Sequence, residues 1–231
     1  MLKIGIILAR GGSKRLPRKN ILPFNGKPLI GWTIEAAVQS AVFDRVLVST
    51  DDEEIRSVAL NFGAEVPFLR SGAADDQIPS SEATIFALRQ AEAHWGCKFD
   101  LVAQLMANCP LRDAQTIRDA VDAFSARDMP ALISCFKYGW MNPWWAVRVG
   151  EEGRPEPVFP EALLKRSQDL PTLYCPTGAI WLAKSRELLA NKSFYAPGHV
   201  FHPIDWVNSI DIDDEDDLRM ANVVFEYKKK R

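Results

Sequence analysis

Five cations and two glycines stand within the twelve-residue stretch ARGGSKRLPRKN, which follows a short apolar run near the N-terminus. Gly11 and Gly12 lack a Cβ, so backbone N–H groups there can turn toward a ligand and form an anion-binding nest. Arg10, Lys14 and Lys19 can converge on the same space. The stretch has neither the G-x-x-x-x-G-K-[ST] of a Walker A loop nor the G-x-G-x-x-G of dinucleotide-binding folds. We therefore expect a polyphosphate-binding loop of another kind.

A second group of residues suited to chemistry lies in SIDIDDEDDL near the C-terminus. Asp211 and Asp213 alternate around Ile212 at what we expect to be a strand end, so both carboxylates point to the same side and can share one Mg²⁺ or Mn²⁺ ion. Helix capping is the alternative role for this pair. Three more acidic residues are expected only to begin the following helix, where the helix dipole favours negative charge: Asp214, Glu215 and Asp217.

The elements that must position these residues alternate between strand and helix signals. Apolar runs predict strands over 3–8, 45–50, 65–69, 100–106 and 131–136. Helical periodicity predicts helices over 29–41, 51–63, 81–95, 114–126 and 214–229. This alternation indicates right-handed βαβ units, hence an α/β, doubly wound, mostly parallel sheet in one domain of residues 1–231. Ligands of such sheets bind beyond the carboxyl ends of the strands, where the glycine-rich loop falls, and this favours binding over a solvated basic loop.

The stretch 138–176 has a different texture, because it is rich in tryptophan and proline and shows no clean period. Trp140, Trp144 and Trp145 would form an apolar patch if all were exposed. We expect a protruding arm that packs on a second copy of the chain in a homodimer, with a small intramolecular cluster as the alternative.

Composition excludes several classes of protein. Among 231 residues, 28 basic side chains are matched by 30 acidic ones, so a protein that coats nucleic acid is not expected. The apolar start is too short for a membrane helix or a signal segment, so we expect a cytoplasmic protein without a membrane partner. The four cysteines are scattered and predict neither a disulfide framework nor a zinc site. The three histidines lack metal-ligand spacing and are expected to be structural: His94, His199 and His202.

The stretch ILARGGSKRLPRKNILPFNGKPLIGWTIEAA resembles the signature A-R-G-G-S-K-[GR]-[LI]-P-x-K-N of the cytidylyltransferases that activate nonulosonic acids, namely the CMP-N-acetylneuraminic, CMP-legionaminic and CMP-pseudaminic acid synthetases. The resemblance continues through STDDEEI, EVPFLR, CPLR, QDLP, GAIW and SIDIDDEDDL, nearly the whole chain. It implies a Rossmann-like fold of the nucleotide-diphospho-sugar transferase type. It also implies a reaction in which CTP and an acidic nine-carbon keto sugar yield the CMP-sugar and pyrophosphate.

The resemblance implies roles for the residues of the first loop. Arg10, Lys14 and Lys19 match the family's triphosphate ligands, and Ser13 and Asn20 match the polar positions beside them. Fixed cations stabilise most where charge develops, which here is the departing pyrophosphate. We expect Lys19 to matter most. Asp211 is expected to be catalytic as well, because a divalent cation bridging Asp211, Asp213 and the triphosphate would lower the repulsion between the α-phosphate and the incoming sugar hydroxyl.

Two further residues resemble contacts on the cytosine side. Arg70 stands in PFLR and Ser81 in PSSEA. The alternatives are a surface residue at a strand end for Arg70 and a helix N-cap for Ser81. Asp51 also follows a buried strand, but its spacing to Glu54 is that of a capping box, so we expect it to begin a helix.

The sugar side departs from the family pattern. Members that use N-acetylneuraminic acid carry L-Q-P-T-S-P-L-R, whereas this chain reads LMANCPLR, so that Met106 replaces a glutamine and Asn108 a threonine. Ser167 stands where an arginine is expected, and the neighbouring Arg166 is able to bind a sugar carboxylate instead. Thr177 replaces an amide. We assign five residues to the sugar side: Met106, Asn108, Arg166, Gln168 and Thr177.

Two rival functions stay open at this stage. A 3-deoxy-manno-octulosonate cytidylyltransferase would carry a loop resembling A-R-Y-G-S-x-R-[LF]-P-x-K, which fits this chain less well. A nucleotide-binding module without catalysis would serve as a regulatory subunit, but the presence of both Asp211 and Asp213 argues against it.

Overall fold

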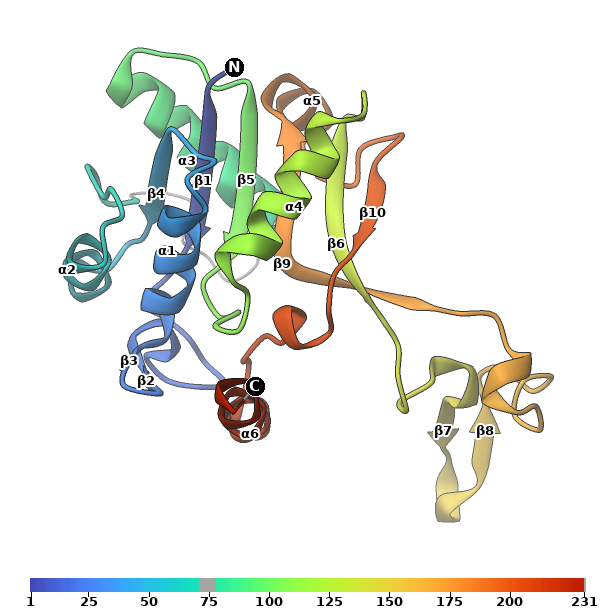
Figure 1. Ribbon diagram of the computed structural model, residues 1–231. Helices are drawn as coiled ribbons and strands as arrows, with labels where there is room; N and C mark the ends of the chain where they lie inside the picture. The colour runs from blue at the N-terminus through green and yellow to red at the C-terminus, as the bar shows by residue number, and fades with distance from the viewer. Residues whose placement is uncertain (71–77, 231) are drawn as a thin grey trace.

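Within residues 1–70 and 78–230, which the computed structural model describes, six strands form the central sheet (Figure 1). Across the sheet they are β10 (Val200–Pro203), β6 (Ala131–Lys137), β9 (Tyr174–Lys184), β5 (Leu101–Met106), β1 (Lys3–Leu8) and β4 (Arg45–Ser49). The pairs β1–β4, β1–β5 and β6–β10 are parallel, whereas β9 runs antiparallel to β5 and β6. The prediction of a mostly parallel sheet is therefore confirmed.

Helices cover both faces of the sheet. One face carries α1 (Leu29–Ser40), α2 (Glu53–Asn61) and α4 (Ala114–Ser125), and the other carries α3 (Ser80–Trp95) and α5 (Ser185–Asn191) (Figure 1). Side chains of strand β1 pack in the cores on both faces of the sheet, because successive side chains point to opposite faces. Ile7 packs in the cluster with α1 and α4, while Ile4 and Ile6 pack in the cluster with α3 and α5. This two-sided burial explains the continuous apolar run and confirms the doubly wound fold.

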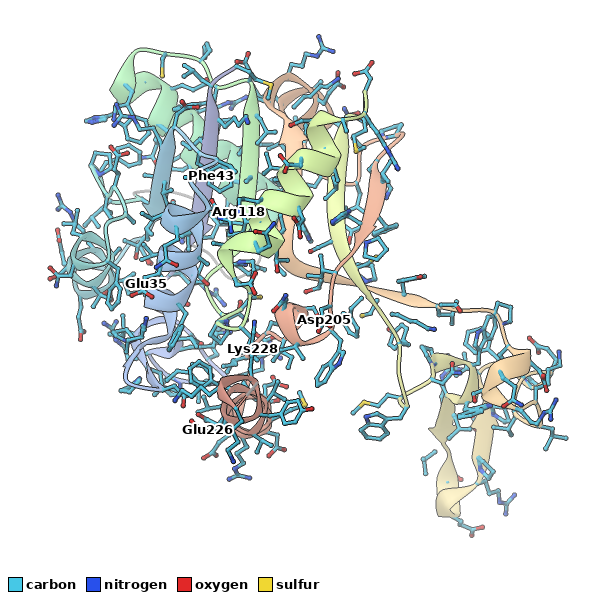
Figure 2. All side chains as sticks on the ribbon, in the orientation of Figure 1. Glu35, Phe43, Arg118, Asp205, Glu226 and Lys228 are labelled. Carbon is cyan, nitrogen blue, oxygen red and sulfur yellow. The ribbon has the colours of Figure 1, made fainter. Side chains whose placement is uncertain are left out.

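Helix α6 (Glu215–Lys229) closes the sheet edge at the carboxyl ends of β1 and β5. It begins at Asp214, whose side chain caps the helix in a capping box, as the acidic cluster predicts. The ring of Phe225 packs 5.5 Å from Phe24, near the short hairpin of β2 (Pro23–Phe24) and β3 (Lys27–Pro28). Lys228, labelled in Figure 2, donates to the carbonyl oxygen of Leu111 at 3.2 Å. The C-terminal helix is thus tied to the loop that follows β5.

An arm projects from the sheet between β6 and β9 (Figure 1). It holds the antiparallel pair β7 (Val147–Val149) and β8 (Pro155–Pro157) and short 3₁₀ turns at Pro143–Trp145, Glu151–Gly153 and Ser167–Asp169. Trp144 packs on Phe159 with ring centroids 5.0 Å apart, but Trp140 is 85% exposed. Part of the aromatic content therefore stabilises the arm itself, and part stays on its surface.

The predicted strand over 65–69 is wrong. Only Glu65 bridges to Leu47 on the edge strand β4. Pro67 follows two residues later and has no N–H to donate, so the ladder ends after one residue.

The predicted strand end at Asp211 and Asp213 is also wrong. A 3₁₀ turn, η5 (Val207–Ser209), precedes this segment, and residues 210–213 pair with no strand. The segment is held instead by the loop after β5, because the N–H of Ile212 donates to the carbonyl oxygen of Asn108 at 2.9 Å. Ile212 is fully buried in the cluster with α6, which leaves the two flanking carboxylates outside that cluster.

Candidate active site

A cleft of about 260 Å³ opens at the carboxyl ends of β1 and β5. Leu8 and Met106, the last residues of these strands, are direct neighbours in the ladder, and Leu8 also pairs with Ser49 at the end of β4. The loops that follow the three strands therefore meet at one edge of the sheet. The cleft is lined by Leu8, Arg10, Ser13, Lys19, Asn20, Arg70, Ile78, Ser80, Ala83, Met106, Ala107, Asn108 and Asp213.

The glycine-rich loop after β1 is fitted closely against the N-terminus of α2. The N–H of Gly11 donates to Asp51 Oδ1 at 2.9 Å, and a Cβ added at Gly11 would lie 2.6 Å from Asp52 Oδ2. Asp52, not Asp51, caps α2 by accepting the N–H groups of Glu54 and Ile55, so the capping role predicted for Asp51 is wrong by one residue. Asp51 is thereby available to hold the loop.

The loop ends in a strained residue. Arg18 has φ of +56° and ψ of +25°, in the left-handed region, and its guanidinium pairs with Asp52 and Glu54. Asn20, which is buried, donates from Nδ2 to the carbonyl oxygen of Arg10 at 2.9 Å and so ties the two ends of the loop together. The surrounding contacts therefore determine the loop backbone, as is usual for strained residues near functional sites.

Cations of the loop meet the second acidic centre in the cleft. Lys19 Nζ lies 2.7 Å from Asp213 Oδ1, and Arg15 lies 2.6 Å from Asp213 Oδ2. Burial alone would raise the pKa of Asp213, but the hydrogen bonds and charges of Lys19 and Arg15 lower it below the ordinary value. Partial desolvation, followed by the negative charge of Asp213, raises the pKa of Asp211. Asp213 thus contacts the glycine-rich loop across 194 residues of sequence, whereas Asp211 is exposed and is not among the residues that line the cleft.

The remaining loop residues lie farther from the cleft lining. Lys14 and Gly12 are exposed, and neither they nor Gly11 are among the residues that line the cleft. Gly12 has no atom within 4 Å of an added Cβ, which leaves open space beside the backbone. These positions are where a bound anion would meet the nest, and their contact with a ligand stays a prediction.

On the side predicted to hold cytosine, Arg70 is buried and lines the cleft, with its N–H donating to the carbonyl oxygen of Thr50 at 2.7 Å. Burial lowers the pKa of Arg70, while the charge of Asp51 raises it. Ser81 is also buried, but its hydroxyl accepts the N–H of Phe194 at 3.4 Å, and it is Ser80 that lines the cleft. Ser81 is not the N-cap either, because α3 begins after Pro79.

The residues assigned to the sugar side fall into two groups. Met106 and Asn108 line the cleft. Thr177 is buried, and its hydroxyl donates to the carbonyl oxygen of Ser209 at 3.2 Å, so it joins β9 to η5. Thr177 therefore contacts the backbone of the chain and is not among the residues that line the cleft.

The other two sugar-side candidates lie on the arm. Arg166 and Gln168 are exposed there, away from the cleft of their own chain (Figure 1). Arg166 pairs with Asp169 at 2.7 Å. The chain therefore does not bring these two residues to the other candidates.

The carboxylate pair fits a magnesium ion that is held together with a substrate. Within the described residues, no group of three or more His, Cys, Asp or Glu side chains is arranged to hold a metal. Mg²⁺, however, is commonly bound by one or two carboxylates and by substrate phosphates. Asp211 and Asp213 supply two carboxylates whose mutual repulsion a cation would relieve, and Asp213 contacts Lys19 of the glycine-rich loop. The donor set therefore suits Mg²⁺ bound with a triphosphate.

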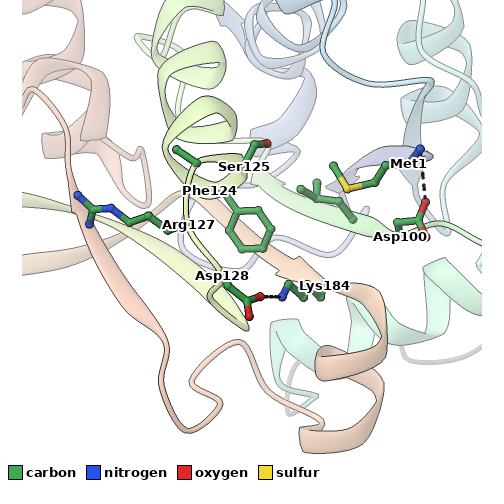
Figure 3. Close-up of a pocket in the computed structure, with 9 residues that line it drawn as sticks. Met1, Asp100, Phe124, Ser125, Arg127, Asp128 and Lys184 are labelled. Carbon is green, nitrogen blue, oxygen red and sulfur yellow. Dashed lines mark hydrogen bonds and ion pairs between the residues drawn. The ribbon is translucent and has the colours of Figure 1, made fainter.

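A second hollow, of about 320 Å³, lies at the opposite end of the sheet (Figure 3). Four of its charged groups form two pairs, since Lys184 contacts Asp128 and the terminal amine of Met1 lies 3.9 Å from Asp100. None of the predicted site residues lines it. The three histidines also lie outside the cleft lining.

The prediction from sequence missed Arg15, Arg18 and Ser80. Arg15 and Arg18 stand in the same basic stretch as the predicted ligands, and nothing in the local spacing distinguishes these two arginines from those ligands. Ser80 adjoins the predicted Ser81, and only the phase of α3 decides which of the two faces the cleft.

Among the described residues, no helix is both long and apolar enough to cross a bilayer.

The chain resembles known proteins both in sequence and in fold. The cytidylyltransferase family model matches residues 4–172. The chain is 34% identical over 228 residues to a pseudaminic acid cytidylyltransferase of Campylobacter jejuni, covering 97% of each chain. It is 33% identical over 235 residues to the CMP-N,N'-diacetyllegionaminic acid synthase of Legionella pneumophila, covering 98% of this chain and 97% of the relative. An N-acylneuraminate cytidylyltransferase of Streptococcus agalactiae is 32% identical over 231 residues, which are 98% of this chain and 54% of that protein.

Solved structures confirm the fold. CMP:2-keto-3-deoxy-manno-octonic acid synthetase in complex with CTP superposes with a TM-score of 0.71 at 18% identity, covering 99% of this chain and 100% of the other. A 4-diphosphocytidyl-2C-methyl-D-erythritol synthase of Anaerococcus prevotii gives a TM-score of 0.64 at 15% identity, covering 97% and 98%. The fold is therefore that of nucleotidyltransferases. With a family model matched over most of its length and relatives at more than 30% identity across it, the chain belongs to the cytidylyltransferase family and is an enzyme of that class.

Proposed function

We propose that this enzyme transfers CMP from CTP to the anomeric hydroxyl of an acidic nine-carbon keto sugar, a nonulosonic acid, and releases pyrophosphate. The observation that carries the proposal is the meeting of Lys19 and Arg10 with Asp213 in one cleft at the ends of β1 and β5. Three relatives named for the activation of pseudaminic, legionaminic and neuraminic acids support the sugar class. Their identities of 34%, 33% and 32% are too close to choose among the three sugars.

The chain's own residues would act on the triphosphate. The oxygen of the sugar hydroxyl attacks the α-phosphorus, and the bond from that phosphorus to the oxygen that bridges to the β-phosphate breaks. The hydroxyl proton passes to water, and negative charge grows on the departing pyrophosphate. Arg10 and Lys19 line the cleft where that charge develops, and Lys14 follows on the same loop. Fixed cations in such positions need no reorganisation during the reaction.

Asp211 and Asp213 would hold Mg²⁺, or Mn²⁺, together with the triphosphate. When bound, the ion would reduce repulsion between the phosphate oxygens and the incoming hydroxyl. The 2.7 Å contact of Lys19 with Asp213 supports this placement, because it sets the carboxylate beside the proposed phosphate ligands.

A homodimer would complete the sugar side. Arg166 and Gln168 lie on the projecting arm, away from their own cleft, so they can serve as sugar ligands only if a second copy receives the arm. The large exposed side chains Trp140 and Met141 at the base of the arm support such a contact. Mixing an inactive Lys19→Ala protein with an Arg166→Ala protein tests this, since mixed dimers would regain one intact site. Failure to regain activity in a dimer shown to exchange subunits would contradict the arrangement.

We place the reaction in the cytoplasm, where CTP is available. The four cysteines are free thiols, which fits a reducing compartment.

The test of the function is incubation of the pure protein with CTP, Mg²⁺ and each of four sugars: N-acetylneuraminic, legionaminic, pseudaminic and 3-deoxy-manno-octulosonic acid. Release of pyrophosphate and the mass of the CMP-sugar are measured. We expect a CMP-sugar from a nine-carbon acid. A product from the eight-carbon acid alone would support the rival cytidylyltransferase, and no product from any sugar would support a nucleotide-binding module.

A further inference from the structure

Asn108 is fastened to the acidic segment by three hydrogen bonds. Its Nδ2 donates to the carbonyl oxygen of Ile212 at 3.0 Å and to Asp213 Oδ1 at 3.2 Å. The main-chain carbonyl oxygen of Asn108 accepts the backbone N–H of Ile212 at 2.9 Å. Asn108 is only 8% exposed. A carboxamide nitrogen carries two hydrogens, so both are committed to this segment and none is left to donate to a sugar.

The other two groups on Asp213 are cations that a bound triphosphate would attract. Lys19 is one of the proposed phosphate ligands, and the side chain of Arg15 is 66% exposed and therefore able to move. Asn108 is neutral, buried and anchored to the backbone of Ile212, so a phosphate does not compete for it. If CTP draws the two cations away, the hydrogen bond from Asn108 to Oδ1 would remain.

From this we infer that Asn108 is a positioning residue for the Asp213 carboxylate, and that it acts on the metal and nucleotide side of the reaction rather than on the sugar. The inference rests on the proposed function, because it takes Asp213 as a ligand of the metal that accompanies CTP. It reverses the assignment of Asn108 to the sugar that its alignment with the family threonine suggests. Groups that orient a metal ligand typically change metal affinity by about 10- to 100-fold when removed.

The test compares Asn108→Ala with a matched control, Thr33→Val. Thr33 is fully buried, and its hydroxyl lies 3.3 Å from the carbonyl oxygens of Met106 and Ala107, so the control disturbs the same end of β5 without touching Asp213. Binding of Mn²⁺ to the protein with CTP and no sugar is followed by electron paramagnetic resonance. The Mg²⁺ concentration for half-maximal rate, the KM of the sugar and the melting temperature are measured in parallel.

We expect Asn108→Ala to weaken Mn²⁺ binding and raise the Mg²⁺ requirement by about tenfold, with the sugar KM within about twofold of wild type. Thr33→Val should lower the melting temperature and leave Mn²⁺ binding unchanged. Asn108→Thr keeps one donor and should fall between wild type and Asn108→Ala. It also tests the inference if the alanine variant does not fold.

A raised sugar KM with unchanged Mn²⁺ binding would overturn the inference and return Asn108 to the sugar. Mn²⁺ binding equally strong in wild type and in both Asn108 variants would overturn it as well. If wild type with CTP binds no Mn²⁺, the proposed metal site itself fails, which is a different result from the failure of Asn108 alone.

Discussion

Replacing Gly11 with alanine tests how closely the polyphosphate loop is fitted to α2. The added methyl would lie 2.6 Å from Asp52 Oδ2, and ordinary contact begins at 3.4 Å, so the two atoms must separate by about 0.8 Å. Asp52 cannot move freely, because Oδ1 accepts the N–H groups of Glu54 and Ile55 at 3.0 Å each and its carboxylate pairs with Arg18. The cap and the loop therefore cannot both stay in place.

Two costs follow from that separation. If the cap breaks, the loss is about 1 kcal/mol, which lowers the melting temperature of a chain of this size by about 2–4 °C. If the loop moves instead, the phosphate ligands shift by nearly 1 Å, and a misplacement of that size lowers kcat/KM by about 100-fold. We expect mainly the second effect, since Asp52 is held by three partners and the loop is held at Gly11 by one hydrogen bond.

Gly12→Ala is the matched control for thermal melting of the protein without CTP, because no atom lies within 4 Å of its added Cβ and neither glycine has a left-handed φ. It is not a control for activity, since Gly12 itself belongs to the proposed anion nest. The assay is the steady-state rate of pyrophosphate release against CTP concentration, with thermal melting of both variants. A Gly11→Ala protein with the kcat/KM and the melting temperature of wild type would refute the close fit of the loop to α2.

The other predictions concern single side chains of the site, the arm and the sheet. Lys19→Ala should lower kcat/KM by about 100-fold or more, as for the loss of one transition-state contact, and unchanged turnover with normal melting would contradict its role. Asp211→Asn and Asp213→Asn should each cut turnover and weaken the Mg²⁺ dependence, whereas a capping role predicts no effect because asparagine caps as well as aspartate. Trp140→Ser should shift the sedimentation of a dimer toward the monomer, and a wild-type monomer at micromolar concentration would exclude the dimer. Burial lowers the pKa of His202 below its ordinary value of 6.5, so the stability it contributes is full above about pH 6.5 and is lost as the pH falls toward the lowered pKa. His202→Gln should flatten that part of the pH profile of unfolding, and an unchanged profile would contradict this.

Much of the fold can be predicted from the sequence, because burial on both faces leaves a continuous apolar run such as that of β1. Helix periodicity is equally local, and it places α4 and α6 within a residue or two of their ends. Each of the two predictions discussed next fails because of a single residue. Pro67 ends a ladder that its apolar neighbours predict, and the N-cap of α2 falls on Asp52 because that residue, with φ of −124° and ψ of +124°, has the extended backbone of a cap.

The site is predictable in its residue types but not in its contacts. The glycines, the cations and the carboxylate pair stand out in the sequence because of their spacing. The sequence does not show that these residues lie together in the fold, since Arg15 contacts Asp213 across 198 residues and Asn108 contacts Ile212 across 104. Such pairings follow from the order of strands in the sheet and from the place of α6. No local pattern shows that Asn108 binds the acidic segment.

The most direct test of the proposed function follows the phosphorus atoms of CTP. The enzyme is supplied with Mg²⁺, a nonulosonic acid and CTP that carries ³²P either at the α- or at the γ-phosphate. Attack at the α-phosphorus predicts that all α-label enters a CMP-sugar and all γ-label leaves as pyrophosphate, with both transfers about 100-fold slower or more in Lys19→Ala. Release of γ-label as inorganic phosphate, with no α-label on the sugar, would contradict transfer of CMP and indicate a different use of the same cleft.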